Sequence, residues 1–163
     1  MKTTWRAVAA VLILGLGGAA QAQTCTPQAG SLNDASATFS VNTCQSTNQL
    51  LSLCNGLDAI GASPDTIYSM QFTTPPVGGI VATPTGYDLK MALLQGTCSA
   101  GSTCLREADS GGVGVAENLL VTGVPIGNYF LVLTSFGGSP DCGSTQVVVN
   151  LIIPVTLQRF SIE

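Results

Sequence analysis

The side chains that could carry out nucleophilic catalysis are few in this 163-residue chain. The chain has no histidine, so a serine nucleophile activated by a histidine base is excluded. A serine–lysine pair would have to use Lys90, because the only other lysine is Lys2, near the N-terminus. Lys90 alternates with apolar residues, and we expect it on the solvated face of a strand. Nucleophilic catalysis is therefore not indicated.

Carboxylates are the remaining candidates for acid–base chemistry. A glycosidase needs two of them on opposite sides of the bond that it cleaves. Five acidic residues lie in or next to the expected turns and strands: Asp88, Glu107, Asp109, Glu117 and Asp141. Asp residues in glycine- and proline-containing loops normally make local turn hydrogen bonds. We therefore predict that the chain is not an enzyme, and keep a small carboxylate-dependent hydrolase as an alternative.

The same loops contain hard oxygen ligands of the kind that calcium binds. Asp109, the backbone of residues 110–114 and Glu117 are the candidate ligands, although their spacing does not match an EF-hand loop. No cofactor is expected, with calcium as the one alternative.

The six cysteines all follow residue 22, and their even number in a chain that we expect to be exported predicts three disulfides. A zinc site is not indicated, because histidine and a Cys-x-x-Cys pair are both absent. Six cysteines allow 15 pairings, and we favour those that close short local loops. The predicted pairs are Cys98–Cys104, Cys44–Cys54 and, from the remaining two cysteines, Cys25–Cys142.

Aromatic side chains would have to be exposed to bind a sugar. The only tryptophan, Trp5, lies in the N-terminal segment. Tyr87 and Phe136 adjoin turns and are the candidate ligand-binding residues. The aromatic residues expected inside strands are Tyr68, Phe72, Tyr129 and Phe130.

The first 22 residues have the pattern of a secretory signal. Lys2 and Arg6 precede an apolar stretch, residues 8–16, and Ala20-Gln21-Ala22 is a small-x-small cleavage signal. The alternative is a lipoprotein anchored through Cys25. Because no later segment offers about 18 unbroken apolar residues, no transmembrane segment is expected. We predict a secreted protein, or one in the periplasm or at the outer cell surface, after signal cleavage.

The charge of the chain limits its partners. Cleavage after residue 22 would leave three basic and nine acidic residues, a net charge of −6. Binding to the nucleic-acid backbone, or to an anionic membrane surface, needs clustered Lys and Arg. Three scattered basic residues do not supply such a cluster, so neither partner is expected.

Short strands separated by turns dominate the chain after the signal. In residues 67–72 the residues Tyr68, Met70 and Phe72 alternate with polar ones, the period-2 pattern of a half-buried strand. Residues 87–94 and 146–153 also read as strands, and no stretch shows a sustained helical period. We predict one all-β domain over residues 23–163, an antiparallel, jelly-roll-like β-sandwich of about eight short strands.

The order of several motifs resembles the bacterial pre-peptidase C-terminal domains. These motifs are "SPDTIYSMQFT", "GYDLKMALLQGTC", "CLREADSGG", "AENLLVTGVPIGNYFLVL" and "TQVVVNLII". The resemblance covers residues 38–153. It implies a compact jelly-roll-like sandwich of the kind attached to secreted proteases and other exported enzymes, some of which help to bind polymeric substrates.

The turn and strand "PIGNYFLVL" supports a scaffold more than a site. Gly127 can take a positive φ, and we expect the strand that follows to bury Tyr129, Leu131 and Leu133. The favoured function is a secreted, non-catalytic binding or display module for an extracellular polymer or protein. An alternative is an assembly protein in which residues 147–153 and 155–162 add a strand to a neighbour's exposed edge. Monomer and edge-strand assembly both stay open.

Overall fold

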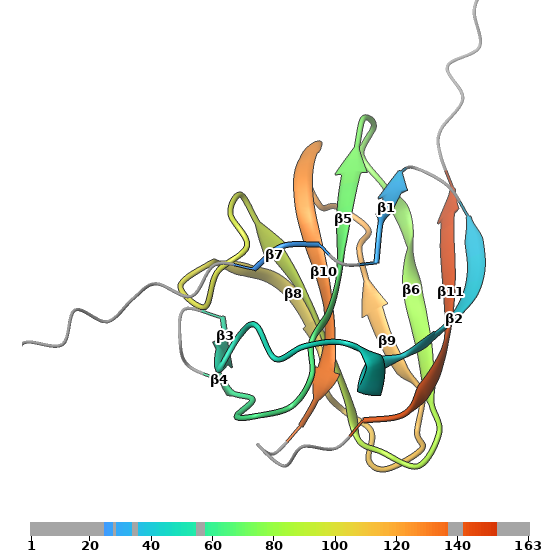
Figure 1. Ribbon diagram of the computed structural model, residues 1–163. Helices are drawn as coiled ribbons and strands as arrows, with labels where there is room; N and C mark the ends of the chain where they lie inside the picture. The colour runs from blue at the N-terminus through green and yellow to red at the C-terminus, as the bar shows by residue number, and fades with distance from the viewer. Residues whose placement is uncertain (1–24, 28, 34–35, 55–57, 137–141, 153–163) are drawn as a thin grey trace, which may run out of the picture.

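The computed structural model describes residues 25–27, 29–33, 36–54, 58–136 and 142–152. These residues form two β-sheets packed face to face (Figure 1). The strands of the first sheet are β1 (Ser31–Asn33), β5 (Thr66–Phe72), β10 (Gly127–Ser135), β7 (Leu89–Gln95) and β8 (Cys104–Ala108), in this spatial order. The strands of the second sheet are β2 (Ala37–Asn42), β11 (Ser144–Ile152), β6 (Val77–Pro84) and β9 (Glu117–Leu120).

The smaller elements connect the two sheets. A short 3₁₀ turn, η1 (Thr43–Gln45), follows β2, and the hairpin of β3 (Ser52–Leu53) and β4 (Asp58–Ala59) precedes β5. All strand pairs are antiparallel except β1 with β5. Eight strands of the described residues have four or more residues. The predicted jelly-roll-like sandwich of about eight short strands is confirmed.

The main core lies between the two sheets and follows the expected alternation. Tyr68, Met70 and Phe72 point into it from β5, and β10 contributes Tyr129, Leu131 and Leu133. The Tyr129 hydroxyl donates to the carbonyl oxygen of Pro125 over 2.7 Å. Gly127 has a φ of +153° at the start of β10, where a side chain would be strained. The prediction for "PIGNYFLVL" is therefore confirmed in its structural part.

A second core covers the other face of the five-stranded sheet. It packs Leu50, Leu53 and Ile60, from the segment between η1 and β5, against Val132 of β10 and neighbouring sheet residues. In Figure 1 this teal segment crosses in front of the five-stranded sheet. Residues 46–65 are called the cover segment below. Because of this segment, part of the outer face of the five-stranded sheet is buried as well, and β7 is buried at six successive residues.

The disulfides differ from all three predicted pairs. The structure pairs Cys25 with Cys98, Cys44 with Cys142 and Cys54 with Cys104, across 73, 98 and 50 residues. The local-loop argument failed because the short loop between β7 and β8 places its two cysteines beside different segments. Cys98 faces the N-terminal Cys25, and Cys104 faces Cys54 of the cover segment. The number of disulfides is as predicted, and no described cysteine is free.

Strand β11 is not available for donation to another chain. Its residues pair with β2 on one side and with β6 on the other. The expectation that residues 147–153 add a strand to a neighbour is therefore wrong for Val147–Ile152, and residues 153 and 155–162 lie outside the described part. No helix in the described residues is long and apolar enough to cross a membrane. The predicted signal, residues 1–22, also lies outside the described residues.

Candidate functional site

A row of polar side chains crosses the covered face of the five-stranded sheet. Thr134 of β10 lies directly opposite Lys90 of β7. One step beyond the Leu133–Thr66 pair, the same register brings Asp65 beside Thr134. Next to Met91, which pairs with Ala108, Lys90 meets Asp109. The four side chains Asp65, Thr134, Lys90 and Asp109 are called the polar row below.

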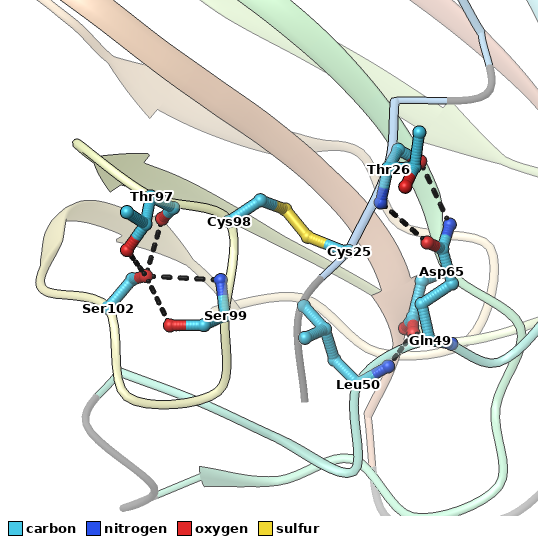
Figure 2. The surroundings of a disulfide bond; sticks show 9 residues. All are labelled: Cys25, Thr26, Gln49, Leu50, Asp65, Thr97, Cys98, Ser99 and Ser102. Atoms are coloured by element: carbon cyan, nitrogen blue, oxygen red, sulfur yellow. Dashed lines mark hydrogen bonds between the residues drawn. A yellow bond between two sulfur atoms is a disulfide. The ribbon is translucent and has the colours of Figure 1, made fainter. Parts of the chain in front are cut away.

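Asp65 anchors the cover segment at one end of the row. The backbone N–H groups of Gln49 and Leu50 donate to its Oδ2 over 2.9 and 2.7 Å. Figure 2 shows both residues close to Asp65, near the Cys25–Cys98 disulfide. Gln49 also exchanges two hydrogen bonds with the backbone of Thr26, which extends the anchor to the N-terminal segment.

The carboxyl group of Asp65 is fully buried. Desolvation raises its pKa above the ordinary value of 3.8, and this effect outweighs the amides of Leu50 and Gln49 and the Thr134 hydroxyl, which lower the pKa. Oδ1 of Asp65 and Oγ1 of Thr134 are both buried, and neither makes a hydrogen bond of normal geometry. The Thr134 hydroxyl nevertheless lies close enough to lower the pKa of Asp65. A buried acid with one free oxygen is therefore enclosed in the fold.

Lys90 lies between Thr134 and Asp109 in the row, and the prediction that it is solvated is wrong. Only 4% of the residue is exposed, because the cover segment turns the outer face of β7 into a second interior. Its Nζ lies 3.3 Å from Oδ2 of Asp109 and 3.8 Å from Oε2 of Glu107. The alternation indicated the correct face of the strand, but it carried no information about what covers that face.

Phe136 follows β10 and lies over this charge cluster. Its ring centroid is 6.0 Å from Nζ of Lys90, within the range of a cation–π contact. Phe136 is 52% exposed, and the Glu107 side chain is 54% exposed. The sequence-based expectation that Phe136 is exposed is confirmed. The name aromatic–acidic surface is used below for Phe136, Glu107 and Asp109, with Lys90 beneath them.

Tyr87, the second candidate for ligand binding, is not exposed. It is 2% exposed, and its hydroxyl makes a hydrogen bond with Oγ1 of Thr145 in β11. Burial raises the pKa of Tyr87, and hydrogen bonds with Thr145 and Thr43 lower it. The prediction was wrong because a position beside a turn was taken to be exposed. The structure packs Gly143 against the ring, with no room for a larger residue.

The candidate calcium ligands face hydrogen-bond donors of the protein. Glu117 is 1% exposed, and its carboxylate accepts from the backbone N–H groups of Ser110 and Gly111 over 3.0 and 2.5 Å. Asp109 is paired with the Lys90 ammonium. Donors and a positive charge thus occupy the positions where a calcium ion would need free oxygens. Among the described residues, no group of three or more His, Cys, Asp or Glu is placed to hold a metal ion.

The candidate hydrolase residues in the described part of the chain contact other groups of the protein. Lys90 lies beside both Glu107 and Asp109, so a positive charge stands between the two carboxylates. Glu117 is sequestered in its turn, and Asp141 lies outside the described residues. Asp88 precedes β7, and its carbonyl oxygen accepts from the N–H of Phe136 over 3.1 Å. The geometry thus favours structural roles for these acids.

Glu107 also touches a disulfide. Its Oε2 lies 3.4 Å from Sγ of Cys54, a sulfur that carries no proton because it is bonded to Cys104. This contact is therefore a close approach and not a hydrogen bond. It places the aromatic–acidic surface next to the point where the cover segment is linked to β8.

Sequence reasoning missed the roles of Asp65 and Thr134. Ser63-Pro64-Asp65 before a strand is a turn signal, and this signal could have singled out Asp65 as a residue that binds backbone amides. For Thr134, one position in a long apolar strand, the sequence carries no comparable signal.

Comparisons with protein-family models, with curated proteins and with solved structures found no match for this chain.

Proposed function

We propose that the chain is exported and acts as a non-catalytic binding module of the extracellular space or the cell envelope. The resemblance of its motifs to pre-peptidase C-terminal domains supports this proposal, as does the signal-like segment of residues 1–22. The three disulfides are compatible with an oxidising compartment.

One observation carries the proposal: Phe136 is the exposed aromatic side chain of the described residues, and it lies on a cluster of fixed charges. A ring held beside carboxylates can pack on an apolar ligand surface while the carboxylates accept hydrogen bonds. Lys90 fixes Asp109 and Glu107 from below, so the acceptors are ordered before a ligand arrives. The ligand class that suits this surface is an extracellular polymer or protein rich in hydrogen-bond donors.

The other chemistry-bearing groups support a non-catalytic role. Asp65 and Glu117 are buried and hold backbone amides, the described cysteines are in disulfides, and the chain has no histidine. The activity expected of this module is therefore binding without turnover.

An array of glycans and matrix proteins, probed with the secreted chain, tests the proposal. We expect a ligand whose affinity falls at least tenfold in Phe136→Ala. Ile126→Ala, which removes another exposed apolar side chain, is the matched control and should leave the affinity unchanged. Binding should also be insensitive to a chelator. Hydrolysis of an array ligand, or equal loss of binding in both variants, would overturn the proposal.

A further inference from the structure

The outer face of the four-stranded sheet is uncovered and carries no charge within the described residues. Its central strand β11 alternates between buried and exposed or half-buried residues, and the cover segment lies on the other sheet. The polar side chains of this open face are hydroxyls and amides, among them Ser40, Thr83, Asn118, Gln146 and Asn150. A whole sheet face without Asp, Glu, Lys or Arg is notable in a chain that has nine acidic residues.

An exposed apolar strip lies at one end of the open face. Ile152 of β11 pairs directly with Val77 of β6, and Leu120 of β9 lies beside Gly79 of β6. The three apolar side chains are 69%, 42% and 59% exposed, in the order Ile152, Val77 and Leu120. Val81 and Val148, also a cross-strand pair, continue the strip toward the middle of the sheet and are half-buried.

We propose that the open face binds a second copy of the chain, so that two sandwiches pack through their four-stranded sheets. An apolar strip flanked by uncharged polar side chains matches the composition of protein–protein interfaces, in which charged residues are depleted. The same face on both copies would meet itself around a two-fold axis.

The dimensions of the face fit a dimer interface. Strands β2, β11, β6 and β9 have 6, 9, 8 and 4 residues. At about 3.3 Å per residue and about 4.8 Å between strands, they cover roughly 430 Å² in projection. A stable interface buries about 800 Å² of accessible surface on each partner. The accessible surface of projecting side chains exceeds the projection, so the face approaches the size of such an interface.

Charge explains why a second copy would dock on this face and not on the five-stranded sheet. Two copies carry the same net negative charge, and they can approach closely only where neither presents acids. Glu107 and Asp109 extend from β8 in the other sheet. With packed sheets about 10 Å apart, the two five-stranded sheets of the dimer would lie about 30 Å apart. This separation is several times the Debye length of about 8 Å at physiological ionic strength.

Sedimentation equilibrium of the secreted chain between about 1 and 100 µM tests the proposal. We expect the mass to rise toward twice the monomer mass, with little dependence on salt, because the face is uncharged. The double variant Val77→Glu/Leu120→Glu should weaken association at least tenfold. Leu51→Glu/Val113→Glu adds the same two charges at exposed apolar positions in the cover segment and in the loop between β8 and β9, outside the strands of the face, and should associate like the wild type.

A second pair of substitutions separates docking from misfolding. Ser40→Glu/Thr83→Glu places charges on two exposed polar positions of the same face that are separated by Gln146 of β11, and it should also give monomers with an unchanged melting temperature. Equal association of all variants would overturn the proposal. A wild-type chain that stays monomeric at 100 µM would also overturn it. Residues 153–163 or a different molecule would then be the occupant of the face.

Discussion

The two outer faces of the sandwich differ in what covers them. The outer face of the five-stranded sheet lies under the cover segment and contains the polar row, including the buried Lys90. The open face of the four-stranded sheet has no cover and no charge within the described residues. Two of the three disulfides lie on the covered side. Cys25–Cys98 links the N-terminal segment to the loop between β7 and β8, and Cys54–Cys104 links the cover segment to β8.

This difference shows how a small second core is kept in place. The second core has eight buried residues, and the described residues of the cover segment contain only the two-residue strands β3 and β4. A segment with so little regular structure gains little from backbone pairing, and small cores commonly need covalent support. The cover therefore depends on disulfides and on Asp65, whereas the main core depends on its sheets.

Among changes to what holds the cover segment in place, removal of the Cys54–Cys104 disulfide should have the largest effect. The bridge closes a loop of 50 residues, and chain-entropy arithmetic gives a loss of about 4 kcal/mol when such a bridge is absent. Cys54→Ser/Cys104→Ser should lower the free energy of unfolding by about this amount in urea denaturation. It should also increase hydrogen exchange at Gln49 and Leu50 more than in β11. Uniform loss of protection in both sheets would argue against a separately held cover.

Asp65 should account for the next largest effect. Asp65→Ala leaves the buried N–H groups of Gln49 and Leu50 without an acceptor, and each such group costs about 1–3 kcal/mol. We expect a total loss of about 3 kcal/mol. Asp65→Asn should cost less than half as much, because the amide oxygen can still accept both bonds. Thermal unfolding of the two variants measures the difference, and equal losses would contradict an anchoring role.

The pH dependence of stability provides a separate test of Asp65. Because burial raises its pKa, the folded chain keeps the Asp65 proton to a higher pH than the unfolded chain does. The contribution of Asp65 to stability therefore rises as the pH falls through the raised pKa, and it levels off below 3.8. Wild type should gain stability relative to Asp65→Asn as the pH is lowered from 7 to about 4. A constant difference between the two would show that the carboxyl group is not desolvated.

The Lys90–Asp109 pair should show a smaller and asymmetric effect. Asp109→Asn removes the nearer of the two carboxylates that contact the buried ammonium, and we expect a loss of about 2 kcal/mol. Lys90→Met removes the buried charge and leaves carboxylates that water can reach, so it should cost less than about 1 kcal/mol. Chemical denaturation of both variants gives the ranking, and the reverse order would mean that Lys90 is better hydrated than its burial indicates.

The sequence predicted the sandwich because the sheet residues that face the main core follow a local rule. Tyr68, Met70 and Phe72 alternate with polar residues, and Gly127 stands where a positive φ is needed. The disulfide pairs, in contrast, depend on which segments meet in space, and sequence proximity of Cys98 and Cys104 gave the wrong answer.

The candidate site was predicted only in part, for a related reason. Phe136 was correctly expected to be exposed, whereas Tyr87 and Lys90 are buried. A period-2 pattern separates the two faces of a strand, but it does not say whether a distant segment will cover the second face. For Lys90 the covering residues belong to the cover segment, 25 or more residues earlier in the chain. No local sequence pattern predicts this contact.

The smallest effect is expected at the centre of the open face, where a charge should be tolerated. Val148 of β11 is half-buried and points to solvent. Val148→Glu should change the free energy of unfolding of the monomer by no more than about 0.5 kcal/mol, as is usual for surface substitutions. The matched variant Val132→Glu places the same charge on β10, at a residue that is fully buried under the cover segment. Burying an unpaired carboxylate is far more costly, so Val132→Glu should fail to fold or lose more than 4 kcal/mol, roughly the largest class of single-residue effects. Denaturation at micromolar concentration, where monomers predominate, measures both. A large loss in Val148→Glu under these conditions would mean that part of the same chain covers this face too, and that the two outer faces are more alike than the described residues indicate.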